Sequence, residues 1–247
     1  MNRPKLIVLE NAEAVCVRAA EEIVHFSGEA ICTHGQFNLC LTGGNTPADT
    51  YRLMATRFHL SVDWKEVNFY WGDERCVPPD DPASNFGMAH RTLLSSVTLK
   101  PGQVHRMHGE DDPGKAAGAY EADLKSTFSL DDGAFPRFDL TLLGLGDNAH
   151  IVSLFPGHPA IHEQKRLVVP VEVDAPQRKR ITLTAPVINQ SARIMFIVAG
   201  QNKAKAVKQV LEGPRDVNQF PGQVVQPSNG EVLWVLDKGA ASMLTSA

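Results

Sequence analysis

The chain has 247 residues, of which 43% are hydrophobic and 21% are charged, and its formal net charge is −4. This length supports one α/β domain with a substantial core, and we expect a single domain over residues 1–247. The negative net charge argues against non-specific nucleic-acid binding, although local basic clusters could still hold a small anion. The four cysteines show no CxxC spacing, so we expect reduced thiols in a cytoplasmic protein, without a zinc site or a disulfide framework.

The N-terminal segment predicts a strand followed by a helix. No apolar run of the chain approaches the ~20 residues of a membrane span. The run Leu6–Leu9 is also too short for the core of a signal peptide, and it predicts a first strand. Residues 11–27 then carry apolar side chains at helical spacing, with Asn11 as the N-cap of the predicted helix.

A second predicted strand, Phe37–Leu41, ends in the sequence Thr-Gly-Gly-Asn-Thr-Pro, and a helix with Thr46 as its N-cap follows. Glycines between a strand and a helix N-terminus can form an anion cradle of backbone N–H groups, which the helix dipole assists. The alternative is a tight turn that needs glycine, since no Walker lysine follows. Both interpretations stay open for Gly43 and Gly44.

The third predicted strand, Val67–Trp71, is followed by an acidic pair beside a guanidinium, Asp73-Glu74-Arg75. One of the two carboxylates could orient a water molecule or a sugar hydroxyl. Arg75 could bind a phosphate through two hydrogen bonds. The alternative is a surface ion pair, which is common and contributes little to stability.

The next segments are a loop, a helix that begins at Ser84-Asn85, a connection that contains a strand, and an amphipathic helix (residues 77–82, 84–94, 99–106 and 113–130). His105 and His108 are spaced i,i+3, which is a possible metal-binding pattern. No acidic or cysteine partner completes a ligand set, so we predict loop histidines and no metal site.

The stretch from Phe138 to Gly157 carries the strongest functional signal. Its apolar first half, residues 138–143, predicts a strand that is buried on both faces. Two glycines break this strand, and a polar cluster with His150 follows at once. Open α/β sheets bind their ligands at the carboxyl ends of strands. His150 is therefore our candidate for the group that does chemistry.

The last third of the chain predicts four more strands, a helix and a short C-terminal helix (strands at residues 167–173, 180–183, 193–199 and 231–236, helix at 201–211). Strands that alternate with helices predict an α/β fold with a single, doubly wound, mostly parallel sheet and helices on both faces. The basic run Arg178–Arg180 is either a solvated turn or a means of presenting Arg180 to an anion. Lys203 stands in the first turn of a helix, where the dipole disfavours a cation, and this favours a binding role.

Two familiar kinds of site fit the chain poorly. Gly144, Gly146 and Ala149 match the relaxed dinucleotide fingerprint, but Pro156 and Gly157 leave too little helix after it. A serine hydrolase of the G-x-S-x-G type is excluded because that motif is absent. A phosphate cradle, scattered cations and a histidine at a strand tip remain, and these suit acid–base chemistry on a phosphorylated small molecule.

Six stretches, in order along nearly the whole chain, resemble the 6-phosphogluconolactonase family. They are TGGNTP, WGDERCVPPDDPASNFGMA, FDLTLLGLGDNAHIVSLFPG, RITLTAPVINQSA, GQNKA and EVLWVLDKGAA. The resemblance implies the sugar-phosphate isomerase/lactonase-like fold, shared with glucosamine-6-phosphate deaminases. It also implies hydrolysis of 6-phosphoglucono-1,5-lactone in the oxidative pentose phosphate pathway, with no organic cofactor and no metal.

The family motif G-x-G-x-D-G-H-T-A-S-L-F-P places its histidine on His150, whereas its aspartate falls on Asn148 and its glycine on Ala149. The resemblance thus implies His150 as the general base, with Asn148 and Asp73 as the other catalytic candidates. The implied substrate- and phosphate-binding residues are Gly43, Gly44, Asn45, Thr46, Arg75, Arg180 and Lys203.

The asparagine at position 148 leaves alternative functions open. Asn148 can hold the imidazole by a hydrogen bond but supplies no charge, although Asp147 or Asp73 could compensate. The alternative to a lactonase is therefore a sugar-phosphate-binding protein with weak or no catalysis. A deaminase-like enzyme is disfavoured, because Phe155 stands where the deaminases carry a glutamate. We expect a small sugar phosphate as ligand, no nucleic-acid or membrane partner, and a monomer or weak homodimer.

Overall fold

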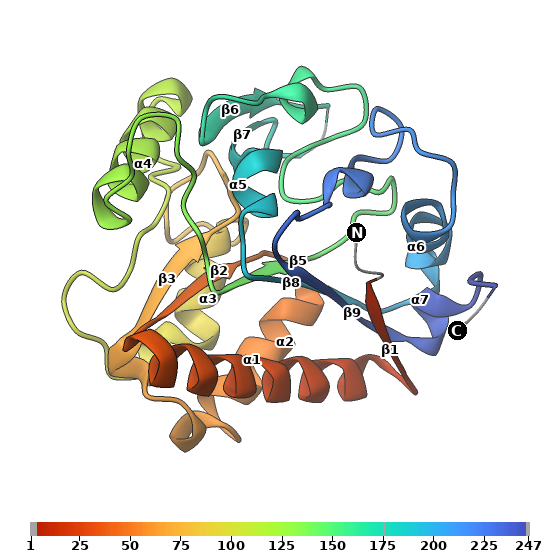
Figure 1. The fold of residues 1–247 in the computed structure, drawn as a ribbon, viewed down its shortest axis with the longest axis horizontal. Helices are drawn as coiled ribbons and strands as arrows, with labels where there is room; N and C mark the ends of the chain where they lie inside the picture. Colours follow the sequence, from red (N-terminus) through yellow and green to blue (C-terminus); the bar gives the residue numbers. More distant parts are fainter. Residues whose placement is uncertain (1–3, 175, 246–247) are drawn as a thin grey trace.

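The computed structural model describes residues 4–174 and 176–245 (Figure 1). Six strands form a central parallel sheet in the order β1-β9-β8-β5-β2-β3. They are β1 (Lys5–Leu9), β2 (Phe37–Leu41), β3 (Val67–Trp71), β5 (Leu140–Leu143), β8 (Arg193–Val198) and β9 (Glu231–Asp237). The predicted class, a doubly wound and mostly parallel α/β sheet, is confirmed.

Helices cover both faces of this sheet (Figure 1). One face carries α1 (Ala12–His34), α2 (Asn45–Ala55) and α3 (Asn85–Thr92), and the other carries α4 (Pro113–Thr127), α5 (Ala185–Asn189), α6 (Ala204–Leu211) and α7 (Lys238–Ala241). Short 3₁₀ helices lie in the connections, at His59–Ser61, Trp64–Glu66, Leu94–Ser96, Pro159–His162, Gln201–Lys203 and Pro221–Val224. Every residue of β2 and β5 is buried, as expected for inner strands of a sheet with both faces covered.

A second, smaller sheet lies on the face that carries α4 (Figure 1). It is antiparallel and consists of β4 (Asp73–Arg75), β7 (Lys179–Leu183) and β6 (Val168–Glu172), in that order. The strands predicted near residues 167–173 and 180–183 therefore exist, but they do not join the main sheet. Period-2 patterning identifies a strand without identifying its partner.

Gly72 is the point at which the chain passes from the main sheet to the small one. Its backbone N–H donates to the Leu41 carbonyl at 3.0 Å, and its own carbonyl accepts from Leu183 N–H at 2.8 Å. A Cβ here would approach Val152 Cγ1 to 2.8 Å, which is closer than side-chain atoms pack. Glycine is therefore required where the two sheets meet.

The structure corrects the predicted extent of the first helix and one predicted strand. The first helix continues past residue 27 and ends only at Gly35, whose φ of 80° forms a left-handed cap. The connection at residues 99–106 contains no full strand, because only Val104 bridges to Phe69 at the sheet edge. The turn at Pro101 removes the chain from that edge on one side of the bridge.

The order of the strands reverses between β2 and its neighbour β5. The chain moves outward from β2 to β3 in one direction, and from β5 through β8 to β9 in the other. Ligands of open α/β sheets bind outside the carboxyl ends of the strands at such a switch point.

Within residues 4–174 and 176–245, no helix combines the length and the apolar character that crossing a bilayer requires.

Candidate functional site

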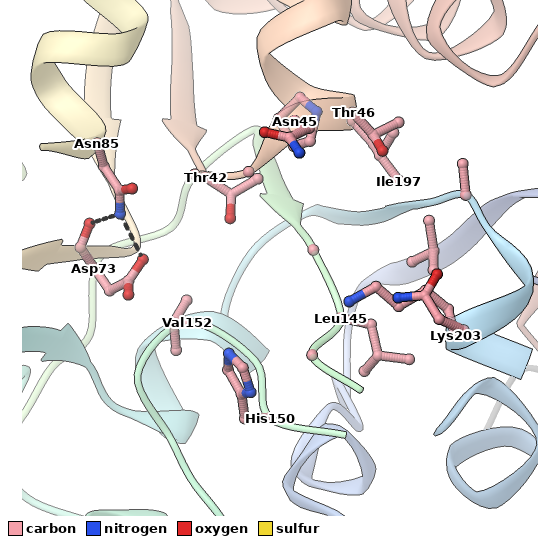
Figure 2. A pocket seen from close by; sticks show the side chains of 18 of the residues that line it. Thr42, Asn45, Thr46, Asp73, Asn85, Leu145, His150, Val152, Ile197 and Lys203 are labelled. Carbon is pink, nitrogen blue, oxygen red and sulfur yellow. Dashed lines mark hydrogen bonds between the residues drawn. The ribbon is translucent and has the colours of Figure 1, made fainter. Parts of the chain in front are cut away.

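A cavity of about 480 Å³ opens at this switch point, where the loops after β2, β5 and β8 converge (Figure 2). Its lining includes every predicted site residue except one: Gly43, Gly44, Asn45, Thr46, Asp73, Arg75, His150, Arg180 and Lys203. The exception is Asn148, which contacts His150 instead of the cavity. The fold thus brings together candidates that are widely separated in the sequence.

A tight turn after β5 presents His150 to the cavity. The Gly146 N–H donates to the His150 carbonyl at 2.9 Å, and the Ala149 N–H donates to the Gly146 carbonyl, also at 2.9 Å. A Cβ on Gly146 would overlap the His150 ring, so the ring packs directly against glycine backbone. Ala149 holds a φ of 63°, a left-handed conformation that glycine adopts more easily. This turn conformation is the physical reason for a glycine at that place in the family motif.

Asn148 fixes the orientation and the tautomer of His150. Its Oδ1 accepts a hydrogen bond from the His150 backbone N–H at 3.3 Å and lies 2.6 Å from His150 Nδ1. A backbone N–H can only donate, so the atom that it meets must be the amide oxygen. That oxygen then requires a proton on Nδ1. Nε2 of His150 is consequently left with a free lone pair.

Burial keeps this imidazole neutral. The burial of His150 lowers its pKa from 6.5 to about 4, and this is the largest of several contributions. The carboxylates of Asp73 and Asp147 oppose the shift, whereas Arg180 and Lys203 add to it. The Phe155 ring stacks on the imidazole with centroids 4.1 Å apart. At neutral pH the side chain is therefore a base with an available nitrogen.

Asp73 is a buried carboxylate on the far side of the cavity from Lys203 (Figure 2), with only 5% of its surface exposed. One carboxylate oxygen accepts from the Ser153 hydroxyl at 2.6 Å and the other from Asn85 Nδ2 at 3.0 Å. The surface ion pair considered for this segment is therefore wrong. The carboxylate is held between two neutral donors and borders the cavity.

Glu74 has a structural role. Its carboxylate accepts hydrogen bonds from the backbone N–H groups of Asn85 and Phe86, at 2.7 and 2.8 Å, and from the Ser84 hydroxyl at 3.0 Å. These donors form the N-terminal end of α3. The side chain is 2% exposed, and burial raises its pKa. Glu74 therefore fixes α3 against β4, and of the acidic pair only Asp73 lines the cavity.

The small sheet places two arginines side by side. Arg75 on β4 is directly opposite Arg180 on β7 in the antiparallel register, and both line the cavity. Arg180 is 7% exposed and donates to the carbonyls of Pro176 and Gln177 at 3.0 and 3.2 Å. The buried Nε of Arg75 has no hydrogen-bond partner among the described residues. Neither guanidinium forms an ion pair with another described residue, and two such cations suit an anionic ligand.

The N-terminus of α2 forms another part of the lining. The helix begins at Asn45, and Gly44, with a φ of 112°, is its N-cap; the prediction that Thr46 caps the helix was wrong. No side chain caps the first turn. The first N–H groups of a helix have no intrahelical acceptor, so those of Asn45 and Thr46 remain available at the cavity.

Lys203 reaches the cavity from a 3₁₀ turn that precedes α6, and its ammonium group lies across from the α2 N-terminus (Figure 2). It forms an ion pair with Asp147, which also accepts from Asn202 Nδ2 at 3.1 Å. The hydrogen bond from Lys203 lowers the pKa of Asp147. This pairing compensates the unfavourable position of a lysine at a helix start.

Several residues of the site were missed or given no role at the level of sequence. Asn85 was predicted only to begin a helix, Ser153 was not assigned a partner, and Phe155 was noted only as the replacement for a glutamate. Their side chains touch Asp73 or His150. These contacts join segments that are distant in the chain or depend on loop geometry, so no local pattern announces them.

The chemistry available here is acid–base chemistry on an anion. Among the residues that the structure describes, no three His, Cys, Asp or Glu side chains are placed to hold a metal ion together. His105, once a possible metal ligand, is paired through Nδ1 with Asp123 at 2.8 Å. A neutral base, a buried carboxylate, two arginines and a helix N-terminus therefore define the site.

Comparison with known proteins gives a consistent answer. The family described as glucosamine-6-phosphate isomerases/6-phosphogluconolactonase matches residues 10–234. The 6-phosphogluconolactonase of Synechocystis is 36% identical over 242 residues, which cover 98% of each chain. That of Mycobacterium tuberculosis is 37% identical over 246 residues, which cover 97% of this chain and 98% of the relative. The structure of 6-phosphogluconolactonase from Trypanosoma cruzi is similar with a TM-score of 0.87 at 28% identity, covering 98% of this chain and 97% of that one.

Proposed function

The chain belongs to the family of glucosamine-6-phosphate isomerases and 6-phosphogluconolactonases, and on this premise we propose that it hydrolyses 6-phospho-D-glucono-1,5-lactone to 6-phospho-D-gluconate. Relatives that match nearly its full length carry the name of this hydrolase. A role in the oxidative pentose phosphate pathway of the cytoplasm is part of the proposal.

The observation that carries the mechanism is the free Nε2 of His150 at the cavity. Asn148 holds the proton on Nδ1, and burial keeps the ring neutral down to a pH of about 4. A neutral imidazole can accept a proton from water at physiological pH. His150 is therefore the general base of the proposed reaction.

In the proposed reaction, the oxygen of a water molecule attacks the lactone carbonyl carbon while Nε2 of His150 takes one of its protons. Backbone N–H groups of the loops that contain Gly43, Gly44 and Gly144 stabilise the oxyanion that develops. The bond between the carbonyl carbon and the ring oxygen then breaks, and the imidazolium returns its proton to that oxygen. The negative charge of Asp73 stabilises the transient imidazolium, because it favours the charged form of His150.

The phosphate of the substrate would bind between the cations and the first turn of α2. Arg75, Arg180 and Lys203 provide positive charge, and the N–H groups of Asn45 and Thr46 provide donors. Gly43 and Gly44 allow the backbone to approach the ligand. Holding the lactone over His150 in this way can remove several kcal/mol, about 7 or more in favourable cases, from the barrier of a two-molecule reaction.

The geometry of Asn148 favours an enzyme over a binding protein without catalysis. In a serine protease, an asparagine in place of the orienting aspartate costs about 10⁴-fold, because the histidine takes the wrong tautomer. Here the amide oxygen, not the amide nitrogen, faces Nδ1 of His150. The tautomer that leaves Nε2 free is preserved, and only a negative charge at position 148 is missing.

Turnover of freshly generated lactone, corrected for spontaneous hydrolysis, tests the proposal. The parent protein should show catalysis, and His150→Gln should lose about 10²- to 10⁴-fold in kcat while its affinity for 6-phosphogluconate is kept. A parent protein that binds 6-phosphogluconate without turnover would be a binding protein instead. Release of ammonia from glucosamine 6-phosphate would assign the chain to the deaminases.

A further inference from the structure

Phe155 lies against both the base and a buried arginine of the cavity. Its ring is stacked on the His150 imidazole, with centroids 4.1 Å apart and planes 14° apart. The Cζ atom of Arg180 lies over the same ring, 5.3 Å from its centroid. Phe155 is not one of the described residues that line the cavity. Phe155 is therefore connected to the cavity through these two neighbours.

The imidazole ring must be held in place by its neighbours, because the χ2 torsion of histidine has a broad energy profile. The hydrogen bond from Nδ1 to Asn148 restrains the rotation of the ring at one edge. The backbone of Gly146 packs against the ring so closely that no Cβ fits. The flat ring of Phe155 supplies a further contact, across the face of the imidazole. Together these contacts define the direction of the Nε2 lone pair.

The guanidinium of Arg180 is restrained by the same ring. Two of its nitrogens donate to the carbonyls of Pro176 and Gln177, and the Phe155 face supports the group as a cation–π partner. Because Arg180 lines the cavity, its position sets where a bound anion lies. The base and an anion-binding group therefore share one apolar surface.

We propose that Phe155 is a positioning residue for lactone hydrolysis, which holds the plane of the His150 imidazole and the Arg180 guanidinium in a fixed relation. The inference rests on the proposed function of His150 as the base. The aromatic ring acts through its flat shape, so another planar ring should replace it and a branched aliphatic side chain should not. It does not touch the substrate.

The ring also excludes water from one face of the imidazole. Burial is the main reason for the low pKa of His150, and the charges that face it act in both directions: Arg180 and Lys203 lower the pKa, and Asp73 and Asp147 raise it. Removal of the ring admits water without changing any of these charges. The pKa of His150 should then rise from about 4 towards its ordinary value of 6.5.

The test compares Phe155→Leu with Phe155→Tyr and with the control Phe128→Leu. Phe128 is also half-buried and packs in the same apolar core, against Tyr70 and Phe138, but it does not contact the base. We expect Phe155→Leu to lose about tenfold to a hundredfold in kcat, as for a small misplacement of a reacting group. The pH–rate profile should shift upward with the pKa of His150, read from its NMR titration. Phe155→Tyr should keep the parental kcat and the parental pKa of His150, and Phe128→Leu should change neither quantity.

A folded Phe155→Leu protein with the parental kcat and an unshifted His150 titration would overturn the proposal. If that variant does not fold, the parent protein itself decides. The stacked ring should move the His150 Cε1–H resonance upfield, and an unshifted resonance would contradict the stacking. If the proposed function itself is wrong, the parent protein shows no turnover of the lactone. This outcome is distinct from a failure of the proposal for Phe155.

Discussion

The two sides of the cavity are built in different ways. The base loop, residues 144–155, makes its defining contacts within itself: Gly146 with His150, Asn148 with His150, and Phe155 with His150. The cationic side, consisting of Arg75, Arg180, Lys203 and the first turn of α2, is assembled from segments distant in the chain. Changes in the base loop that spare Asp147 and Phe155, which contact Lys203 and Arg180, should therefore alter proton transfer and leave anion binding intact. Anion binding, in contrast, depends on how the two sheets meet.

The largest expected effect comes from a single methyl group in the base loop. Gly146→Ala places a Cβ within the His150 ring and must displace it. We expect kcat to fall by about a hundredfold or more, with the affinity for 6-phosphogluconate kept within a few-fold. Gly118→Ala, in helix α4 and outside the cavity lining, is the control, because no atom lies within 4 Å of a Cβ built there. Equal losses in the two variants would contradict this account of the loop.

The cationic side is tested by Arg180→Gln. A charged hydrogen bond to a phosphate contributes about 1.5–3 kcal/mol, so the affinity for 6-phosphogluconate should fall about tenfold to a hundredfold. The KM for the lactone should rise with it, and isothermal titration at two salt concentrations checks the electrostatic origin. Arg178→Gln provides the control, since that side chain is 67% exposed and forms a 3.5 Å ion pair with Glu172 outside the cavity lining. If both variants bind equally well, Arg180 does not hold the anion.

The pH dependence of kcat/KM tests the base loop separately from the cationic side. A base must be neutral, so kcat/KM should fall as the pH decreases through the pKa of His150, which is about 4, and should be flat above a pH of about 5. Asn148→Asp adds a negative charge that favours the imidazolium, so the acidic limb should move to higher pH and the plateau should rise about threefold to tenfold. Asn148→Leu removes the hydrogen-bond acceptor and should lower the plateau instead. An acidic limb that stays in place in Asn148→Asp would mean that another group controls the rate.

The smallest expected effect concerns backbone strain in the base loop. Relief of the left-handed conformation of Ala149 is worth about 1–2 kcal/mol, which roughly cancels the loss of a buried methyl and the greater chain entropy of glycine. Ala149→Gly should therefore change the free energy of unfolding by less than about 0.5 kcal/mol. Ala117→Gly, at a fully buried position of helix α4, should destabilise by about 1–2 kcal/mol. Urea unfolding of the two variants measures the difference.

Local chemistry in the sequence was sufficient for the parallel sheet and for the loop that carries His150. Apolar runs predicted strands near β2, β3, β5, β8 and β9, because a strand buried on both faces is apolar throughout. The glycines before His150 marked the loop at a strand end, and the family motif marked the histidine itself. The N-terminal boundary of α4 and the Ser84 cap of α3 were also predicted correctly from the sequence, since proline and serine act on the adjacent backbone.

Only the tertiary structure decided how the cationic side is assembled and how the His150 imidazole is held. No local pattern places Arg75 opposite Arg180, because the register of β4 and β7 depends on both strands and on the bend at Gly72. The stack of Phe155 on His150 likewise requires the loop to close on itself. Patterns of period 2 and 3.6 report the faces of single elements, whereas pairing and stacking are properties of two elements in contact.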